Sequence, residues 1–361
     1  MNACLSGGFT SFAFSSFFIG IIGFSTALVA QYLGAGKHPN CPKVLTQTII
    51  FSCLSTPILL VLIPVGRWVL ATTGLSAGEM AQAQTYLTIL MAGNALDLFR
   101  QSFNGYFGGL GKTRVVLLST FAMAIANVCA NYILIFGKLG FPAMGIMGAG
   151  YGTLFAWFVG LITLCTVYSK QIRFPEYQLL QSFQLDIEIL KKLVRFGLAS
   201  GLRITLLIFA IDLTILAFQS YGVEVSTAIT VIFTWFQTLF IPVIGLEIGT
   251  MSLAGRFVGA RDLDSASDSV FSGLFLASAY ALILSLACLA VTPAMVELFL
   301  EPDSSVATRD LAIWGTQLNA FLMFILAWAS ILGGALRGAG DTYGVMFISA
   351  GFWWLQYALV V

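Results

Sequence analysis

Ionisable residues interrupt the long apolar stretches of this chain at five positions: Asp97, Arg100, Arg203, Asp212 and Glu247. A charge surrounded by hydrocarbon is unfavourable unless it is paired, so each of these residues is a candidate for function. Asn127 and Asn131 add two amides that lie four residues apart, which places both on one face of a helix. Ion pairing, proton exchange and cation coordination are the chemistry that this set offers.

Four of the five charges have plausible partners. Asp97 and Arg100 are three residues apart on one helix, close enough to neutralise each other. Arg203 and Glu247 lie on neighbouring antiparallel segments joined by a short turn near Gly222. Counting about 1.5 Å of helix per residue from that turn gives the two a comparable depth near the cytoplasmic side. We therefore expect Arg203 and Glu247 to form a structural or gating ion pair.

Asp212 differs from the other four. It lies about 14 Å from the outer end of its helix at about 1.5 Å per residue, a depth that no Lys or Arg of another apolar segment reaches. Desolvation disfavours the ionised form, so a carboxylate there can take and release a proton near neutral pH or coordinate Na⁺ together with nearby carbonyls. The alternative is a carboxylate that faces a watery outer vestibule and has no role in ion coupling.

Transmembrane helices must carry these residues. Hydrophobic residues make up 58% of the chain and charged residues only 9%, with a mean hydropathy of +0.93, outside the range of soluble domains. The apolar runs reach the ~20 residues that cross a bilayer and lack the alternation of barrel strands. Ten spans are predicted, at about 9–33, 44–65, 84–108, 114–137, 148–169, 193–221, 226–257, 268–298, 309–337 and 343–361.

The basic residues orient these spans. Twelve Lys and Arg residues fall on one side, from Lys37 to Arg337, whereas only Arg67, Lys138 and Arg309 fall on the other. The first side is cytoplasmic by the positive-inside rule, which predicts a multi-pass protein of the cell (inner) membrane. The longest inner loop runs from about Ser169 to Arg195, and its second half is predicted to form an interfacial helix.

The sequence also repeats itself. "VAQYLGAGK" around Gly34 returns in altered form around Gly259, at an offset of 225. "GYFGGLGKT" returns as "GALRGAGDT", with Gly109 over Gly338 at an offset of 229. We expect an all-α polytopic protein of two homologous bundles, 1–180 and 181–361, as parallel repeats with a pseudo-twofold axis along the membrane normal. The offsets leave about ten helices of an expected twelve, with the first helix of one lobe and the last helix or more of the other missing.

The sequence gives little support for an enzyme or for a nucleotide-binding protein. "GLGKT" at 109–113 suggests a phosphate-binding loop, but that motif requires a glycine where this chain has Tyr106, and no strand precedes it. His38 is the only histidine and lies in a cytoplasmic loop, so no histidine-based metal site or catalytic dyad is available within the membrane. We expect no enzyme, no metal, no cofactor, no nucleotide and no nucleic-acid partner.

Several motifs together resemble the multidrug and toxic compound extrusion (MATE) transporters over essentially the whole chain. They are "VAQYLGAGK", "GYFGGLGKTR", "NVCANYILIFGKLGFPAMGIMGAGYGT" (127–153) and "PVIGLEIGTMSLAGRFVGAR" (242–261). The resemblance implies a monomeric secondary antiporter that exports drug-like or organic cationic compounds in exchange for H⁺ or Na⁺. It also implies two lobes that rock around a central cavity by alternating access.

The resemblance bears on two of the candidate positions. The family uses an N-x-x-x-N/D pair, here Asn127 and Asn131, in a polar cation or proton network, although two asparagines could simply bond across helices to hold the bundle. The family often places an acid in the helix of Asp212 about one and a half turns earlier, where this chain has Leu207. The ion-coupling candidates are therefore Asp212, Asp97, Asn127 and Asn131.

Two other classes remain open. A lipid-linked oligosaccharide or lipid flippase of related architecture would require cationic residues for a diphosphate, and only Arg100 and Arg203 are available, both with possible acidic partners. A channel would require polar residues along a continuous path. The expected partners are the lipid bilayer and small organic molecules, which aromatic side chains could hold by apolar and cation–π contact.

Overall fold

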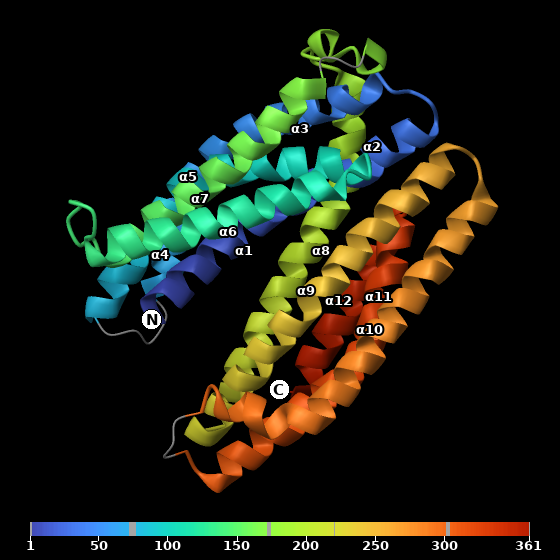
Figure 1. Cartoon of the computed structure of the whole chain (residues 1–361). Helices are drawn as coiled ribbons and strands as arrows, with labels where there is room; N and C mark the ends of the chain where they lie inside the picture. Colours follow the sequence, from blue (N-terminus) through green and yellow to red (C-terminus); the bar gives the residue numbers. More distant parts are fainter. Residues whose placement is uncertain (1, 72–76, 172–174, 220, 301–303, 361) are drawn as a thin grey trace. The chain divides into compact units, whose positions relative to one another are not determined.

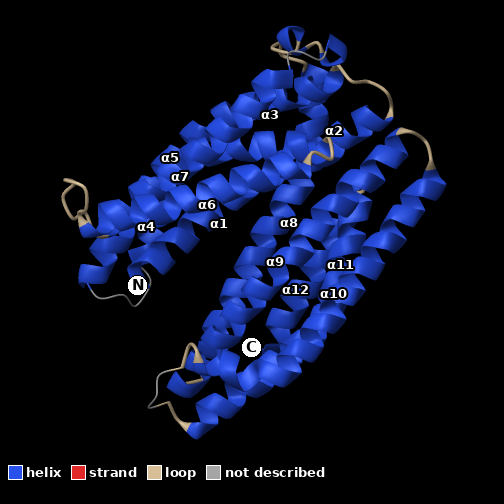
Figure 2. Ribbon diagram, viewed as in Figure 1, coloured by secondary structure: helices blue, strands red, loops and turns tan. Residues whose placement is uncertain are grey.

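A computed structural model describes residues 2–71, 77–171, 175–219, 221–300 and 304–360. Within these ranges the regular structure consists of twelve α-helices and two short 3₁₀ turns, with no strand (Figures 1 and 2). Eight helical segments are long and apolar enough to cross a membrane. The chain divides into two compact units, 1–205 (unit 1) and 206–361 (unit 2).

Unit 1 contains the first seven helices, two 3₁₀ turns and the first half of α8. Their bounds are α1 (Asn2–Gly23), α2 (Ser25–Gly34), α3 (Asn40–Val61), α4 (Ile63–Ala71), α5 (Ala77–Gly109), α6 (Thr113–Phe136), α7 (Ile146–Lys170), η2 (Pro175–Tyr177), η3 (Leu179–Gln181) and α8 (Ile187–Gln219). The long helix α5 is the central helix of the unit, since it contacts α1, α2, α3, α4, α6 and α7.

Unit 2 contains the rest of α8 and four further helices. Their bounds are α9 (Val223–Gly259), α10 (Leu263–Glu297), α11 (Val306–Ala339) and α12 (Thr342–Val360). Here α11 is central, because it contacts α9, α10 and α12. The boundary between the compact units lies inside α8, and the division into lobes at residue 180 stays a prediction.

Each of the ten predicted spans coincides with one helix or with a broken pair, but two of these helices, α5 and α12, are not among the eight described segments that are long and apolar enough to cross a membrane. The first span overlaps α1 and α2, which are separated at Phe24, and the second overlaps α3 and the start of α4, which are separated at Leu62. The second break follows from Pro64, which has no N–H to offer the helix and whose ring would collide with the carbonyl of residue 60. The two breaks turn ten spans into twelve helices.

The interfacial helix predicted before residue 195 is not a separate element. Helix α8 begins at Ile187 and continues without interruption into the membrane-length segment. Ile189 and Leu193 on its first turns are buried, while Ile187 is exposed. The amphipathic pattern is therefore the first part of a spanning helix that lies against unit 1.

The repeat is present in the turn geometry of both units. The first copy places positive φ at Gly36 and Gly111, and the second places it at Arg261 and Gly340, at the same offsets of 225 and 229. The closing hydrogen bonds recur as well: Lys112 N donates to Phe107 O, and Asp341 N donates to Leu336 O, each at 2.9 Å. These are Schellman-type helix ends, in which a left-handed residue satisfies the last carbonyls.

A close helix crossing recurs in the same register. In unit 1, a Cβ added at Gly109 of α5 would lie 2.6 Å from the carbonyl oxygen of Thr26. In unit 2, a Cβ at Gly338 of α11 would collide with the carbonyl oxygen of Met251, the residue 225 positions after Thr26. Only glycine lets the helix backbones approach this closely, as at the small-residue interfaces of membrane helices.

The crossing in unit 2 gives a first test. Gly338→Ala should lower the midpoint of thermal unfolding in detergent, because forcing a methyl group against backbone costs about 1–3 kcal/mol. Gly245→Ala on α9 is the matched control, since an added Cβ meets nothing within 4 Å there. Equal midpoints for the two variants would contradict the crossing.

Candidate functional site

The buried charges of unit 1 lie on its central helix. Asp97 is 6% exposed, and its Oδ1 accepts a hydrogen bond of 2.9 Å from Nε of Arg100 and a second from Nη2 of the same guanidinium. The stem of Arg100 runs along α7, where a Cβ at Gly160 would lie 3.2 Å from Cδ of Arg100. The two charges therefore neutralise each other within α5, which lowers the cost of burying them.

The two asparagines of α6 lie together on one face. Nδ2 of Asn131 donates to Oδ1 of Asn127 at 3.1 Å. Oδ1 of Asn131 is buried and accepts no hydrogen bond from a described residue. It lies against Gly152 of α7, where an added Cβ would collide with it. A buried acceptor without a donor is the group that a cation or a bound proton can satisfy.

Asn94 of α5 is a further buried polar residue, which is not among the residues predicted from the sequence. Its side chain is buried three residues before Asp97, and Nδ2 finds no acceptor in the described part of the chain. The usable signal was an amide in an apolar run one helical turn from a charge. Among the buried amide atoms of unit 1 without a partner in the described residues are thus a donor on α5, Nδ2 of Asn94, and an acceptor on α6, Oδ1 of Asn131.

Unit 2 contains a buried ion pair that the sequence did not predict. Glu247 of α9 binds Arg337 of α11 through Oε1 and Nη2, with both side chains buried. Nε of Arg337 also donates to Gly333 O at 3.3 Å. A Cβ at Gly334 would lie 2.6 Å from the carbonyl oxygen of Glu247, so the pair lies at the glycine crossing. The contact predicted between Arg203 and Glu247 would join the two units and stays a prediction.

Asp212 lies on α8 in the part of the helix that belongs to unit 2, and it is half-buried. Its carboxylate has no hydrogen-bond or ion-pair partner among the described residues, in contrast to Asp97 and Glu247. Leu207, the position at which the resemblance implies an acid, lies on the same helix.

The Glu247 pair predicts an asymmetry between single and double variants. Glu247→Leu alone should lower expression and the unfolding midpoint, because removing one partner of a buried pair costs about 3–5 kcal/mol. The double variant Glu247→Leu/Arg337→Met should recover much of that loss, since neither charge remains. Thermal unfolding of purified protein in detergent measures both, and a double variant less stable than the single one would contradict the pairing.

Comparison with known proteins identifies the family of this chain. The family model described as MatE matches residues 4–133 and 202–359. The "Uncharacterized transporter YisQ" of Bacillus subtilis is 25% identical over 325 residues, which cover 88% of this chain and 69% of that protein. The "Probable multidrug resistance protein NorM" of Bacillus anthracis is 25% identical over 345 residues, covering 93% of this chain and 74% of the relative.

Solved structures share the fold. The structure described as "Crystal structure of MATE in complex with MaL6" aligns with a TM-score of 0.87 at 20% identity, covering 99% of this chain and 80% of the other. An "Outward-facing conformation of a multidrug resistance MATE family transporter of the MOP superfamily" aligns with a TM-score of 0.84 at 18% identity, over 96% and 76% of the two chains. Since the family model covers most of its length, this multi-pass membrane protein belongs to the MatE family of multidrug and toxic compound extrusion transporters.

Proposed function

We propose that this transporter is a secondary active antiporter that exports drug-like or organic cationic compounds in exchange for H⁺ or Na⁺ by alternating access. Membership of the MatE family supports the transport class, and relatives named as multidrug resistance proteins support the type of cargo. The chain also has the aromatic content, 31 Phe, 7 Trp and 11 Tyr, from which a surface for organic cations can be built.

The proposal of ion coupling rests on a difference in pairing among three acids of the predicted spans, Asp97, Asp212 and Glu247. Asp97 and Glu247 each bind an arginine, so their charges are already compensated. Asp212 has no such partner within the described ranges. A half-buried carboxylate without a cation gains stabilisation from H⁺ or Na⁺, and that gain can drive transport. We propose Asp212 as the coupling residue in unit 2.

In unit 1 we propose that Asn127 and Asn131 take part in ion binding. Oδ1 of Asn131 is an acceptor with no donor, and Oδ1 of Asn127 has already accepted one bond. Two amide oxygens on adjacent turns can contribute to the oxygen ligands that a hard cation prefers. The proposal rests on the position of these oxygens in the described part of unit 1.

The charge pairs argue against the flippase alternative. A lipid diphosphate would need cationic side chains that are available to the phosphates. Arg100 is paired with Asp97, and Arg337 is paired with Glu247, whereas the pairing of Arg203 remains a prediction. Breaking either pair to bind a lipid would leave a buried acid uncompensated. Organic-cation export remains the function that these contacts favour.

Asp212→Asn provides the direct test of coupling. The change keeps the shape of the side chain and removes its charge, so efflux driven by an imposed pH or Na⁺ gradient should be abolished. Binding of an organic cation such as ethidium should remain measurable. The assay uses protein reconstituted in liposomes, with Asp341→Asn, in the turn between α11 and α12, as the matched control. Gradient-driven efflux at the wild-type rate would refute the assignment.

The asparagine pair gives a second functional test. Asn131→Leu removes both the free acceptor and the bond to Asn127, so gradient-driven efflux should fall at least about tenfold, the loss expected when a buried amide is left without its hydrogen bond. Asn131→Asp keeps an oxygen at the same position and should retain transport with an altered dependence on pH or Na⁺. The same liposome assay reads both variants. Equal efflux by Asn131→Leu and the wild type would show that the pair serves packing alone.

A further inference from the structure

The segment 175–186, called the linker here, connects α7 to α8 and packs against the end of unit 1. Tyr177, Leu179 and Ser182 are buried, although they lie outside the long helices. The ring of Tyr177 lies 5.9 Å from that of His38 and the same distance from Nζ of Lys112. The linker therefore has a packed inner side formed by residues of two loops of unit 1.

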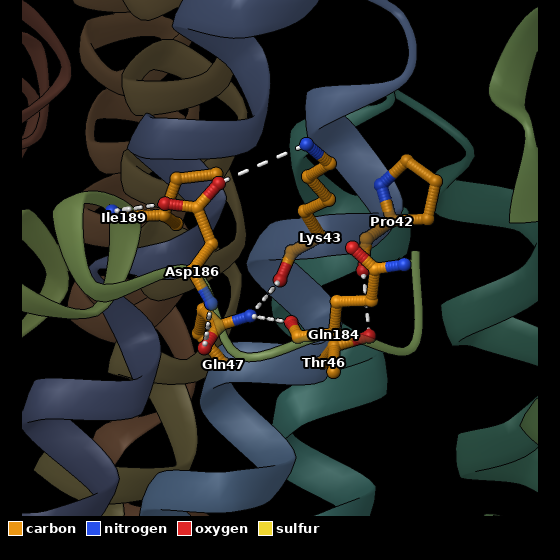
Figure 3. Close-up of polar contacts among 7 residues, drawn as sticks. All are labelled: Pro42, Lys43, Thr46, Gln47, Gln184, Asp186 and Ile189. Carbon is orange, nitrogen blue, oxygen red and sulfur yellow. Dashed lines mark hydrogen bonds and ion pairs between the residues drawn. The ribbon is translucent and has the colours of Figure 1, made fainter. Parts of the chain in front are cut away.

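The side chain of Gln47 on α3 binds the main chain at the end of the linker (Figure 3). Its side chain is fully buried; Nε2 donates to Gln184 O at 2.9 Å, and Oε1 accepts from Asp186 N at 3.2 Å. The two bonds flank Leu185: one joins Gln47 to the carbonyl of the preceding residue and the other to the N–H of the following residue. A residue of a parallel β-strand pairs with the neighbouring strand in the same way. Nε2 also donates to Lys43 O at 3.3 Å, so the buried amide has partners for both its donor and its acceptor groups.

Asp186 connects the anchored linker to α8 because its side chain caps the first turn of that helix. Its Oδ1 accepts from Ile189 N at 3.1 Å, which caps the first turn of the helix, and its Oδ2 lies 3.8 Å from Nζ of Lys43 (Figure 3). The ion pair is partly exposed and contributes little by itself. The cap and the two bonds from Gln47 fix the position at which α8 begins.

The first half of α8 is then packed along α1. A Cβ at Gly197 would lie 2.9 Å from Ile21 O, and one at Gly201 would lie 2.5 Å from Phe17 O. Ser16 Oγ and Thr205 Oγ1 are hydrogen-bonded at 3.2 Å. Between Asp186 and Thr205 the chain thus contacts the preceding helices of unit 1 at Asp186, at the two glycines and at Thr205.

We infer that Gln47 makes the linker a permanent anchor of unit 1, which stays docked through the whole transport cycle, so that any conformational change must begin in α8 after Thr205. The inference rests on the proposed transport function. A connection between two units could instead act as a flexible tether, or as a gate that releases in one state. The buried amide, the helix cap and the glycine contacts with α1 all favour a fixed connection.

Hydrogen exchange measured by mass spectrometry tests docking without requiring transport. Peptides that contain 178–186 should show slow exchange in wild-type protein in detergent. That protection should stay the same at acidic and neutral pH, with and without Na⁺, and with and without ethidium. Loss of protection in any one of these conditions would overturn the inference, because the linker would then undock during the cycle.

Variants of Gln47 test the anchor itself. Gln47→Leu keeps the bulk and removes both bonds, so protection of the linker peptides should fall at least about tenfold, while α10 peptides stay unchanged. Gln47→Glu keeps an acceptor for Asp186 N and loses the donor to Gln184 O, so it should give an intermediate loss. Full protection in Gln47→Leu would overturn the role of Gln47. If Gln47→Leu does not fold, exchange in Gln47→Glu still tests the role of Gln47. Exchange in the wild type under the different conditions still tests whether the linker stays docked.

Covalent fixation links docking to transport. In a variant whose six cysteines are replaced by alanine, Lys43→Cys and Gln184→Cys are joined by a short thiol crosslinker. Efflux by the crosslinked protein should match that of the same variant without crosslinker, because a permanent anchor never opens. Efflux lost only after crosslinking would overturn the inference. Absence of efflux in both would count against the proposed function alone, and the exchange experiment would still report on docking.

Discussion

The close approach of helix backbones is the constraint on which both units depend. Lipid tails are as apolar as leucine, so membrane helices associate through van der Waals contact rather than by excluding water. Such contact is best where side chains are absent. Gly109 brings α5 against α2 near Thr26, and Gly338 brings α11 against α9 near Met251. The central helix of each unit is therefore positioned by main-chain contact, and the remaining helices of the unit pack around it.

The same crossing determines how charge is distributed in unit 2. Glu247 and Arg337 face each other because Gly334 lets α11 lie directly on α9. At the equivalent positions unit 1 has Ile22 and Gly108, so the crossing there is apolar. Unit 1 instead carries its pair on a single helix, between Asp97 and Arg100. The two copies thus share a backbone arrangement and differ in their charges.

Most of the fold could be predicted from the sequence because hydropathy and glycine spacing are local signals. The ten spans and the repeat of the Gly34 and Gly109 turns follow from them. The break at Leu62 had a signal in Pro64, whereas the break at Phe24 follows Gly23 and has no proline nearby. Helix α8 begins before the predicted span at 193–221, because the charged residues of its first turns, Glu188, Lys191 and Lys192, lower the local hydropathy without ending the helix.

The candidate site was harder to predict because it depends on contacts between helices. Arg337 was assigned to the cytoplasmic helix end, but long side chains on a helix point back toward its N-terminus. Its guanidinium accordingly reaches Gly333 O and Glu247 rather than the loop. Asn94 was passed over because it cannot ionise, although a buried amide without a partner is as informative as a charge. Helix depth alone, from which the contact between Arg203 and Glu247 is predicted, gives no indication of the pair between Glu247 and Arg337.

In the linker, Gln47 bonds to peptide groups and not to side chains, so the anchor depends on the spacing of the main chain. Leu185, between the two bonded peptides, is 60% exposed, so its identity has little effect on the bonds that hold the segment. Insertion or deletion of one residue before Asp186 would instead present the wrong peptide to Gln47 and move the cap of α8 along the chain. The anchoring bonds therefore depend on the length of this connection more than on the identity of its exposed side chains.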